Sequence, residues 1–357
     1  MPTPTVVKRP VSPFTVAKIC LGLVVATVVA AGAWSTLTMP AGQRLSAEVW
    51  RELIALGISQ GAVYALIALG YSLVYGILLM INFAHGEVFM VGAFTSFFFA
   101  RVLDTRGLLD DSPILSIAIL FLVSISASTG VAVLLERVAY RPLRGSSRLA
   151  PLITAIGASL FLQYTALGFW GPQTRGYPQP DVLKGDVTIL GFRFGGAQVL
   201  TIVVATISML ALGYFVSKTK TGKAMRATAQ DREIAALMGI RVDRVISTTF
   251  AVGGIMAGIA GVLFALVFGQ VSFQMGFFPG IKAFTAAVLG GIGSISGAAL
   301  GGLLLGLLES VFPFLLLRGF DVPSPNQLKD VIAFSILVLV LIFRPGGLLG
   351  RDDVEKV

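Results

Sequence analysis

The stretch KAFTAAVLGGIGSISGAALGGLLLGLLE, residues 282–309, holds 26 uncharged residues between one lysine and one glutamate. About 20 apolar residues are enough to cross the hydrocarbon core of a bilayer as a helix. Gly290, Gly291 and Gly293 interrupt the middle of the stretch, and clustered glycine favours a break in a helix. The stretch therefore predicts a membrane-embedded helix that breaks near these glycines.

The composition of the whole chain places it in the same class. Of its 357 residues, 55% are hydrophobic and only 13% are charged, about half the usual share in soluble domains. The mean hydropathy is +0.88. Such a chain cannot cover a globule with water-compatible side chains, so we expect an all-α, polytopic integral membrane protein in contact with lipid.

The same counts exclude several other classes. The single cysteine, Cys20, cannot form a disulfide framework or a cysteine metal cluster within this chain, and one histidine makes a poor metal site, so we expect no metal. The net charge of +9 is not arranged as a basic stripe with interleaved aromatic residues, so we expect no nucleic-acid partner.

Charge-free gaps predict where the spans lie. Five gaps each fit one helix: 19–43, 112–135, 149–174, 194–217 and 283–308. The gaps 53–86 and 245–281 are too long for one span and too short for two, and the runs 88–100 and 331–343 are too short alone. Broken or re-entrant helices would explain this, since lipid tolerates them where protein or a cavity covers the freed backbone. We expect about eight full spans, or ten if both broken segments cross.

Residues 1–43 read as an N-terminal extension with an extra apolar span. Lys8, Arg9 and Lys18 precede the apolar run, and the alanines near its end could mimic a signal-peptide cleavage site. The run is longer than a typical signal core and no soluble domain follows it. We therefore favour a retained span over a cleaved signal peptide.

The distribution of charge predicts the topology. If the connectors alternate from the inside, the inner ones carry the whole net charge of +9; they are 1–18, 82–87, 136–148, 218–244 and 344–357. The outer ones sum to zero; they are 44–52, 101–111, 175–193 and 318–330. The positive-inside rule then places the inner set, including a C-terminal tail at 344–357, in the cytoplasm. This topology requires 283–308 to enter and leave again, either as two spans or as a re-entrant hairpin plus a span.

The inner connector 218–244 contains a segment that resembles part of a soluble protein. Between Gly222 and Gly239 the sequence predicts one charged helix that Gly239 ends. Ala235 and Ala236 keep part of its surface small. The helix could dock into a groove of a soluble partner, or it could lie on anionic headgroups as basic amphipathic helices do.

The sequence EIAALMGI, residues 233–240, resembles the EAA-type coupling motif of ABC importer permeases. The match falls on Glu233, Ala235, Ala236 and Gly239, and Ile234 interrupts the strictest form of the motif. The resemblance extends to the branched-chain amino-acid importer's permease at 57–94, 141–163 and 278–310 and at the end RPGGLLGRDDVEKV. It therefore covers most of the chain, with a permease domain at 50–350.

This resemblance implies a function and a set of partners. They are inward transport of branched-chain amino acids across a bacterial cytoplasmic (inner) membrane, a second related permease, two ATPase subunits and a secreted substrate-binding protein. ATP would be used by those partners, and no cofactor would be bound by this chain. The sequence agrees, because Gly222-Lys223 lacks the rest of a phosphate-binding loop: Ser217 stands where the first glycine belongs and Ala224 follows the lysine.

Five polar residues are candidates for the transport pathway. Asn82, His85 and Glu87, in INFAHGE, could surround a helix break near the pore, or could simply cap and pack a helix end. Lys282 and Glu309 are isolated charges in apolar surroundings, where ionisable residues are functional candidates. Alternatively, each could extend its charged head to water near a span end.

Small residues spaced by four predict close helix packing at Gly293, Gly297 and Gly301. A dinucleotide fingerprint is excluded there because no strand–turn–helix context surrounds the glycines.

Three other functions remain open from the residues alone. The same architecture could carry urea, an amide or another amino acid. An ion-coupled secondary transporter could use Glu87, Lys282 or Glu309 as coupling charges. A membrane-embedded enzyme is disfavoured because no cluster of catalytic side chains converges in the sequence.

Overall fold

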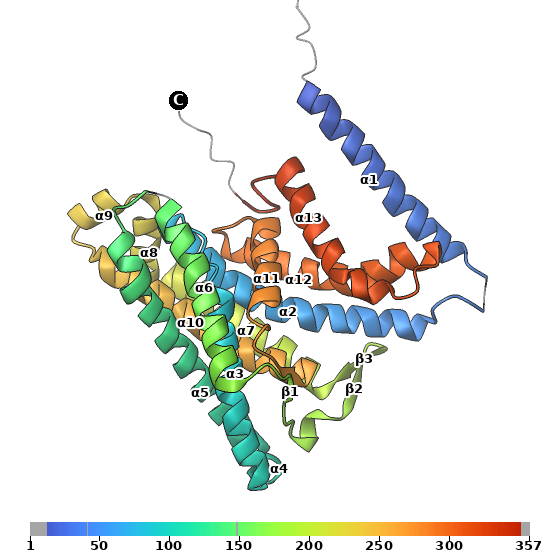
Figure 1. The fold of residues 1–357 in the computed structure, drawn as a ribbon, viewed down its shortest axis with the longest axis horizontal. Coiled ribbons are helices and arrows are strands. Elements are labelled where there is room, and N and C mark those ends of the chain that lie inside the picture. The colour runs from blue at the N-terminus through green and yellow to red at the C-terminus, as the bar shows by residue number, and fades with distance from the viewer. Residues whose placement is uncertain (1–12, 41, 148, 351–357) are drawn as a thin grey trace, which may run out of the picture.

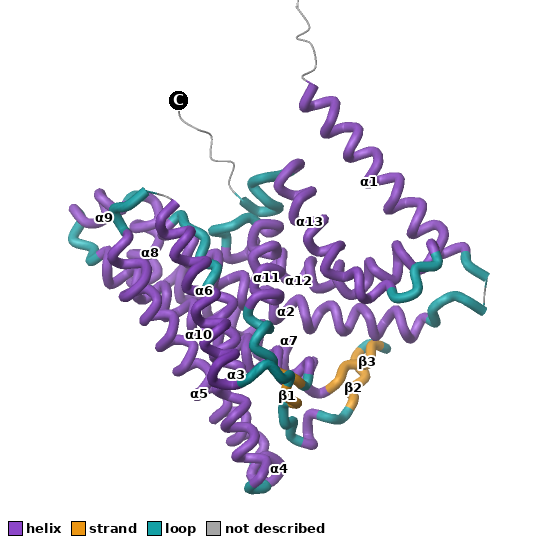
Figure 2. The backbone as a smooth tube through the Cα atoms, in the orientation of Figure 1, coloured by secondary structure: helices purple, strands orange, loops and turns teal. Residues whose placement is uncertain are grey.

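The computed structural model describes residues 13–40, 42–147 and 149–350. Helices make up nearly all of it (Figure 2). In chain order the α-helices are α1 (Pro13–Thr38), α2 (Ala47–Leu78), α3 (His85–Thr105), α4 (Leu108–Asp111), α5 (Pro113–Leu135), α6 (Leu149–Trp170), α7 (Gly196–Lys218), α8 (Lys220–Gln230), α9 (Arg232–Leu237), α10 (Val242–Phe268), α11 (Phe277–Gly290), α12 (Ile295–Phe312) and α13 (Lys329–Phe343). Short π or 3₁₀ turns are η1 (Glu136–Tyr140), η2 (Arg141–Leu143), η3 (Asp181–Leu183), η4 (Pro313–Leu317), η5 (Arg318–Phe320) and η6 (Pro325–Leu328).

Within the described residues, nine helices are long and apolar enough to cross a membrane. This lies between the eight and ten spans that the sequence predicts. The remaining apolar helix, α11, has 14 residues and is roughly 21 Å long, too short for a hydrocarbon core of about 30 Å. A polytopic all-α architecture with one partial span is therefore confirmed.

Helix α2 forms the centre of the bundle, and α7, α10, α11 and α12 pack around it. Its contact with α12 is built on glycine: a Cβ at Gly57 or Gly61 would come within 2.9 or 2.8 Å of the Cα atoms of Leu307 and Leu303. Without those Cβ atoms the two backbones approach closely and gain dispersion contacts that lipid cannot supply. The Ser310 hydroxyl donates to the Leu53 carbonyl at 2.6 Å and ties the same pair of helices.

The break predicted within 53–86 occurs at its end. Helix α2 runs without interruption for 32 residues, and its C-cap Leu79 adopts a left-handed conformation with φ 53°. Residues 79–84 are not helical, and α3 then begins at His85. Because His85 packs against Gly70, well before the end of α2, this broken segment runs back alongside α2. Residues 82–87 are therefore not the exposed inner connector that the charge pattern predicts.

Helices α11 and α12 form the predicted hairpin, with the turn at residues 291–294 (Figure 1). A Cβ at Gly297 would lie 2.4 Å from the Gly290 carbonyl oxygen, and one at Gly301 would lie 2.0 Å from that of Ala286. Both glycines thus lie where the backbones of α11 and α12 come closest. Gly293 does not lie at this close contact. It lies in the turn at φ +89°, where its conformation favours glycine, and the nearest atom to its Cβ position is the Gly76 Cα at 3.8 Å.

Residues that follow α13 complete the end of α11. The Leu348 and Leu349 amides donate to the Leu289 and Gly290 carbonyls, both at 2.9 Å. These are carbonyls that a helix end leaves without partners. Residues 344–350 are thus packed against the hairpin rather than forming a free tail, while the predicted tail residues 351–357 lie outside the described residues.

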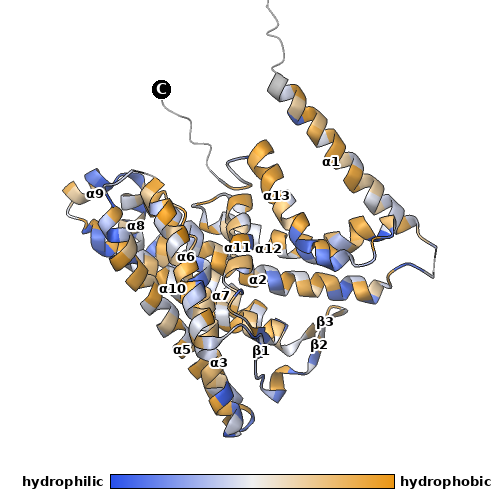
Figure 3. Ribbon diagram, in the orientation of Figure 1, coloured by the Kyte–Doolittle hydropathy of each residue, from blue (hydrophilic) through white to orange (hydrophobic). Residues whose placement is uncertain are grey.

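The two ends of α2 mark the two ends of the molecule. Near its start, Arg51 donates to the Gly191 carbonyl at 2.9 Å, in the turn of the antiparallel hairpin formed by β2 (Asp186–Ile189) and β3 (Phe192–Gly195). Two further short strands, β1 (Arg175–Gly176) and β4 (Gln270–Val271), also pair. At the other end of α2 lie α8 and α9, and hydrophilic residues gather there (Figure 3).

Helix α1 stands largely apart from the bundle and packs mainly through its C-terminal half, against η4 and η5 (Figure 1). The Ser35 hydroxyl donates to the Gly319 carbonyl at 2.8 Å, and the Gly319 amide donates to the Thr36 hydroxyl at 2.9 Å. Most of the remaining α1 surface is exposed, as expected of a helix in lipid.

Candidate functional site

The connector 218–244 folds as two helices, not as the single helix that the sequence predicts. Asp231 separates α8 from α9 because its backbone is extended, with φ −158° and ψ 118°. Its carboxylate then accepts the Ile234 amide at 2.9 Å and caps α9. At the start of α8, Gly222 permits a tight turn, since a Cβ there would lie 2.3 Å from the Val216 carbonyl oxygen.

Helix α9 presents a mostly apolar surface to its surroundings. Ile234, Leu237 and Met238 are 59%, 87% and 78% exposed. Glu233 and Ala236 are exposed as well. Ala235 is only 3% exposed, so its predicted place on the docking surface is wrong: one face of this short helix must pack on its own chain, and Ala235 lies on that face.

Gly239 ends α9 as predicted. Its φ is +85°, and the Ile240 and Gly239 amides donate to the Ala235 and Ala236 carbonyls, both at 3.0 Å. These two hydrogen bonds together form the Schellman motif, which needs a residue in the left-handed conformation and so favours glycine.

Arg232 connects α9 to the end of α2. Its guanidinium donates twice to the Ile77 carbonyl, at 2.6 and 3.2 Å. Ile77 lies in the last turn of α2, immediately before the broken segment 79–84. Partial burial lowers the pKa of Arg232 from its ordinary value, with a smaller contribution from Arg144, although an arginine stays charged.

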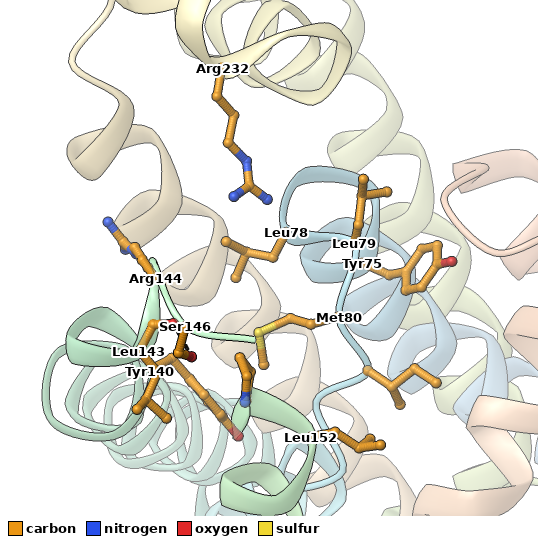
Figure 4. Close-up of a pocket in the computed structure, with 12 residues that line it drawn as sticks. Tyr75, Leu78, Leu79, Met80, Tyr140, Leu143, Arg144, Ser146, Leu152 and Arg232 are labelled. Carbon is orange, nitrogen blue, oxygen red and sulfur yellow. Dashed lines mark hydrogen bonds between the residues drawn. The ribbon is translucent and has the colours of Figure 1, made fainter. Parts of the chain in front are cut away.

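A cavity of about 420 Å³ surrounds this contact. Figure 4 shows Arg232 reaching toward Leu78 and Leu79 from one side, with Arg144 nearby. Met80 and Tyr140 line it further in (Figure 4). The cavity thus lies between α9, the broken segment, and the turns η1 and η2 that follow α5.

The buried carboxylate of Glu136 pairs with the cavity residue Arg144. The sequence analysis did not single out Glu136. Glu136 is fully buried. It pairs with Arg141 at 3.3 Å and with Arg144, and it accepts the Ser247 hydroxyl at 2.7 Å. Arg144 also pairs with Asp243. The sequence did contain an indication of this ion pair, since Glu136 ends the charge-free gap 112–135 and several arginines follow it.

The broken segment brings Asn82, His85 and Glu87 into the protein interior. Asn82 accepts the Tyr140 hydroxyl at 2.6 Å. The His85 ring meets Tyr71 edge-on, with centroids 5.0 Å apart. Glu87 is 0% exposed and accepts the Ser159 hydroxyl at 3.3 Å. All three are buried around the predicted break, and whether they contact a substrate stays a prediction.

Lys282 and Glu309 form a separate cluster. Lys282 Nζ lies 2.6 Å from Glu309 Oε1 and 2.6 Å from Asp330 Oδ1, and Lys329 lies 3.9 Å from Glu309. Lys282 is 5% exposed and Glu309 1% exposed, so neither extends to water. Lys282 and Glu309 neutralise each other, and with Asp330 and Lys329 they connect α11, α12 and α13. This cluster is separate from the Glu87 region. In the part of the chain that the structure describes, no group of acidic, histidine or cysteine residues could hold a metal ion.

Comparison with known proteins gives a consistent family. Residues 53–341 match the family model described as branched-chain amino acid transport system, permease component. The chain is 45% identical over 304 residues to the high-affinity branched-chain amino acid transport system permease protein BraD of Pseudomonas aeruginosa, which covers 84% of this chain and 96% of that protein. It is 43% identical over 307 residues, with the same shares, to the corresponding permease protein LivH of Escherichia coli K12. A solved ABC transporter of the metal-chelate type, inward-facing, aligns over 90% of this chain and 99% of its own, with 17% identity and a TM-score of 0.39.

Proposed function

Since the chain belongs to the family of branched-chain amino acid transport permeases, we propose that α8 and α9 couple it to ATPase subunits and that Arg232 transmits their movement. The chain is a multi-pass subunit of the bacterial cytoplasmic membrane and serves in an ABC importer for branched-chain amino acids. It therefore acts with other ABC components. The family does not favour an ion-coupled transporter or a membrane enzyme.

The complete set of partners is part of the proposal. They are a second related permease, two ATPase subunits and a substrate-binding protein. ATP would be bound by the ATPase subunits, because this chain has no glycine-rich phosphate loop. The permease domain is residues 50–350, and the extension 1–43 carries the additional helix α1, outside the residues that match the family.

The exposed surface of α9 supports docking over a position on lipid headgroups. Leu237 and Met238 are among its most exposed side chains, and Glu233 and Asp231 beside them carry negative charge. Acidic residues are unfavourable against anionic headgroups, whereas apolar side chains on a short fixed helix suit a cleft in a soluble partner.

The contact of Arg232 with Ile77 carries the mechanism. If closure of the ATPase dimer moves α9, the two hydrogen bonds pull on the last turn of α2. The next residue but one, Leu79, is where α2 ends and the broken segment begins. That segment leads directly to His85 and Glu87, so a movement at the surface reaches the buried polar residues through one short covalent path.

Replacing Leu237 with Asp tests the docking surface. We expect the variant to insert normally, because Leu237 is 87% exposed, but to lose the ATPase subunit on co-purification and to lose ATP-driven leucine uptake in proteoliposomes. The matched control is Leu190→Asp, which is 94% exposed in the β2–β3 turn at the other end of α2. Undiminished co-purification and uptake of the Leu237 variant would show that α9 lies on the bilayer.

A further inference from the structure

A second cavity lies beside the buried polar residues, and no function described so far uses it. It measures about 270 Å³, close to the lower end of small-ligand pockets, roughly 300 Å³. Its wall is mostly apolar, and the side chains come from α2, the broken segment, α6 and α11. They include Phe83, Ile156, Leu160, Phe277 and Ile281.

Two lining residues, Tyr71 and Ser159, carry a hydroxyl, and Ser159 is hydrogen-bonded to the buried Glu87. The Ser159 hydroxyl lines the cavity and donates to Glu87 Oε1 at 3.3 Å. Glu87 Oε2 has no hydrogen-bond partner among the described residues. Gly276 precedes the cavity residue Phe277 and makes room for Glu87 Oε2, because a Cβ at Gly276 would lie 2.2 Å from that oxygen.

The Glu87 carboxylate needs a further hydrogen-bond donor, because only one of its two oxygens has a partner among the described residues. Glu87 is 0% exposed, and a buried charge is costly unless it is paired and hydrogen-bonded. Its place in the first turn of α3 offers partial compensation from the helix dipole. The lysine of the α11–α12 hairpin cannot supply the rest, because Lys282 is held by Glu309 and Asp330.

We propose that this cavity is a transient subsite for the transported amino acid, which deepens the proposed function and rests on it. The aliphatic side chain of the substrate occupies the apolar cavity, and its ammonium group donates to Glu87 in place of Ser159. One charged contact and a small apolar surface give weak binding. Weak binding is what a pathway needs, since a site that held the substrate tightly would not release it.

The charge of Glu87 is tested with Glu87→Gln in the complete transporter, reconstituted in proteoliposomes with ATP and radiolabelled leucine. Losing a hydrogen bond to a charged group should lower leucine uptake roughly tenfold or more. ATP hydrolysis stimulated by the binding protein should remain, because α9 is untouched. Glu87→Asp keeps the carboxylate and should retain more uptake than Glu87→Gln. Normal uptake by the Gln variant, or equal loss in both variants, would overturn the subsite.

The apolar cavity is tested separately with Leu160→Phe. Leu160 is 43% exposed, so a larger side chain can be accommodated without unfolding the bundle while it narrows the cavity. We expect leucine uptake to fall more than valine uptake, which raises the valine-to-leucine ratio relative to wild type. An unchanged ratio would show that the substrate side chain does not enter this cavity. Failure of the wild-type complex to take up any branched-chain amino acid would instead contradict the proposed function.

Discussion

Arg232 is the residue at which the surface helix α9 and the broken end of α2 are joined. Arg232→Ala removes both hydrogen bonds to the Ile77 carbonyl, and bonds from a charged donor are worth about 1.5–3 kcal/mol. We expect ATP hydrolysis to continue while leucine uptake falls roughly tenfold. The measurement is the ratio of leucine transported to ATP hydrolysed in proteoliposomes.

Arg226 provides the matched control for this experiment. It also donates to a carbonyl near a helix end, that of Val216 in α7 at 2.5 Å, but α7 leads to no broken segment. Arg226→Ala should therefore leave the transport-to-hydrolysis ratio near the wild-type value. If the two alanine variants lower that ratio equally, the Arg232 contact has no special part in coupling.

Single residues were the hardest features to predict. The motif in 233–240 located α9, but sequence spacing cannot tell which of two adjacent alanines faces inward on a six-residue helix, and the structure buries Ala235. The pairing of Lys282 with Glu309 was equally hidden, since the two lie 27 positions apart. Only the tertiary fold brings such charges together.

The α11–α12 hairpin depends on backbone contact, and Gly297→Leu tests it. A side chain there would overlap the Gly290 carbonyl, 2.4 Å from the Cβ position, so the helices must separate. Overpacking of this kind costs about 3 kcal/mol. We expect a lower melting temperature of the purified subunit and less assembled transporter in the membrane.

Gly130→Leu is the control at the same scale. Gly130 also lies within a membrane helix, α5, but a Cβ there would meet nothing within 4 Å, so stability should change little. Equal melting temperatures for the Gly297 and Gly130 variants would contradict the close-packing account.

At the scale of elements, the glycine cluster and the charge gaps predicted the hairpin, its turn and most spans. They misplaced the residues around 82–87 because the counting treats each charge as exposed, whereas Glu87 is buried within the protein. They also missed the division between α8 and α9, because Asp231 reads equally well as a helix interior residue or as a cap.

The whole molecule has two ends that should face different compartments. We predict that Ser147, exposed beside η2, faces the cytoplasm and that Val182, 70% exposed in η3 before the β2–β3 hairpin, faces outward. Single cysteines at these positions, in a chain with Cys20 replaced by alanine, should label from opposite sides with a membrane-impermeant thiol reagent. Labelling of both in intact cells would contradict the topology.

The pairing of residues 344–350 with the end of α11 has a consequence for how the protein is made. A ribosome releases α11 long before it synthesises Leu348 and Leu349, whose amides complete the last carbonyls of that helix. Until then those carbonyls must be held by water, lipid headgroups or the insertion machinery. The α11–α12 hairpin is therefore made before the last carbonyls of α11 have their protein donors, and its end is completed only when residues 344–350 fold against it.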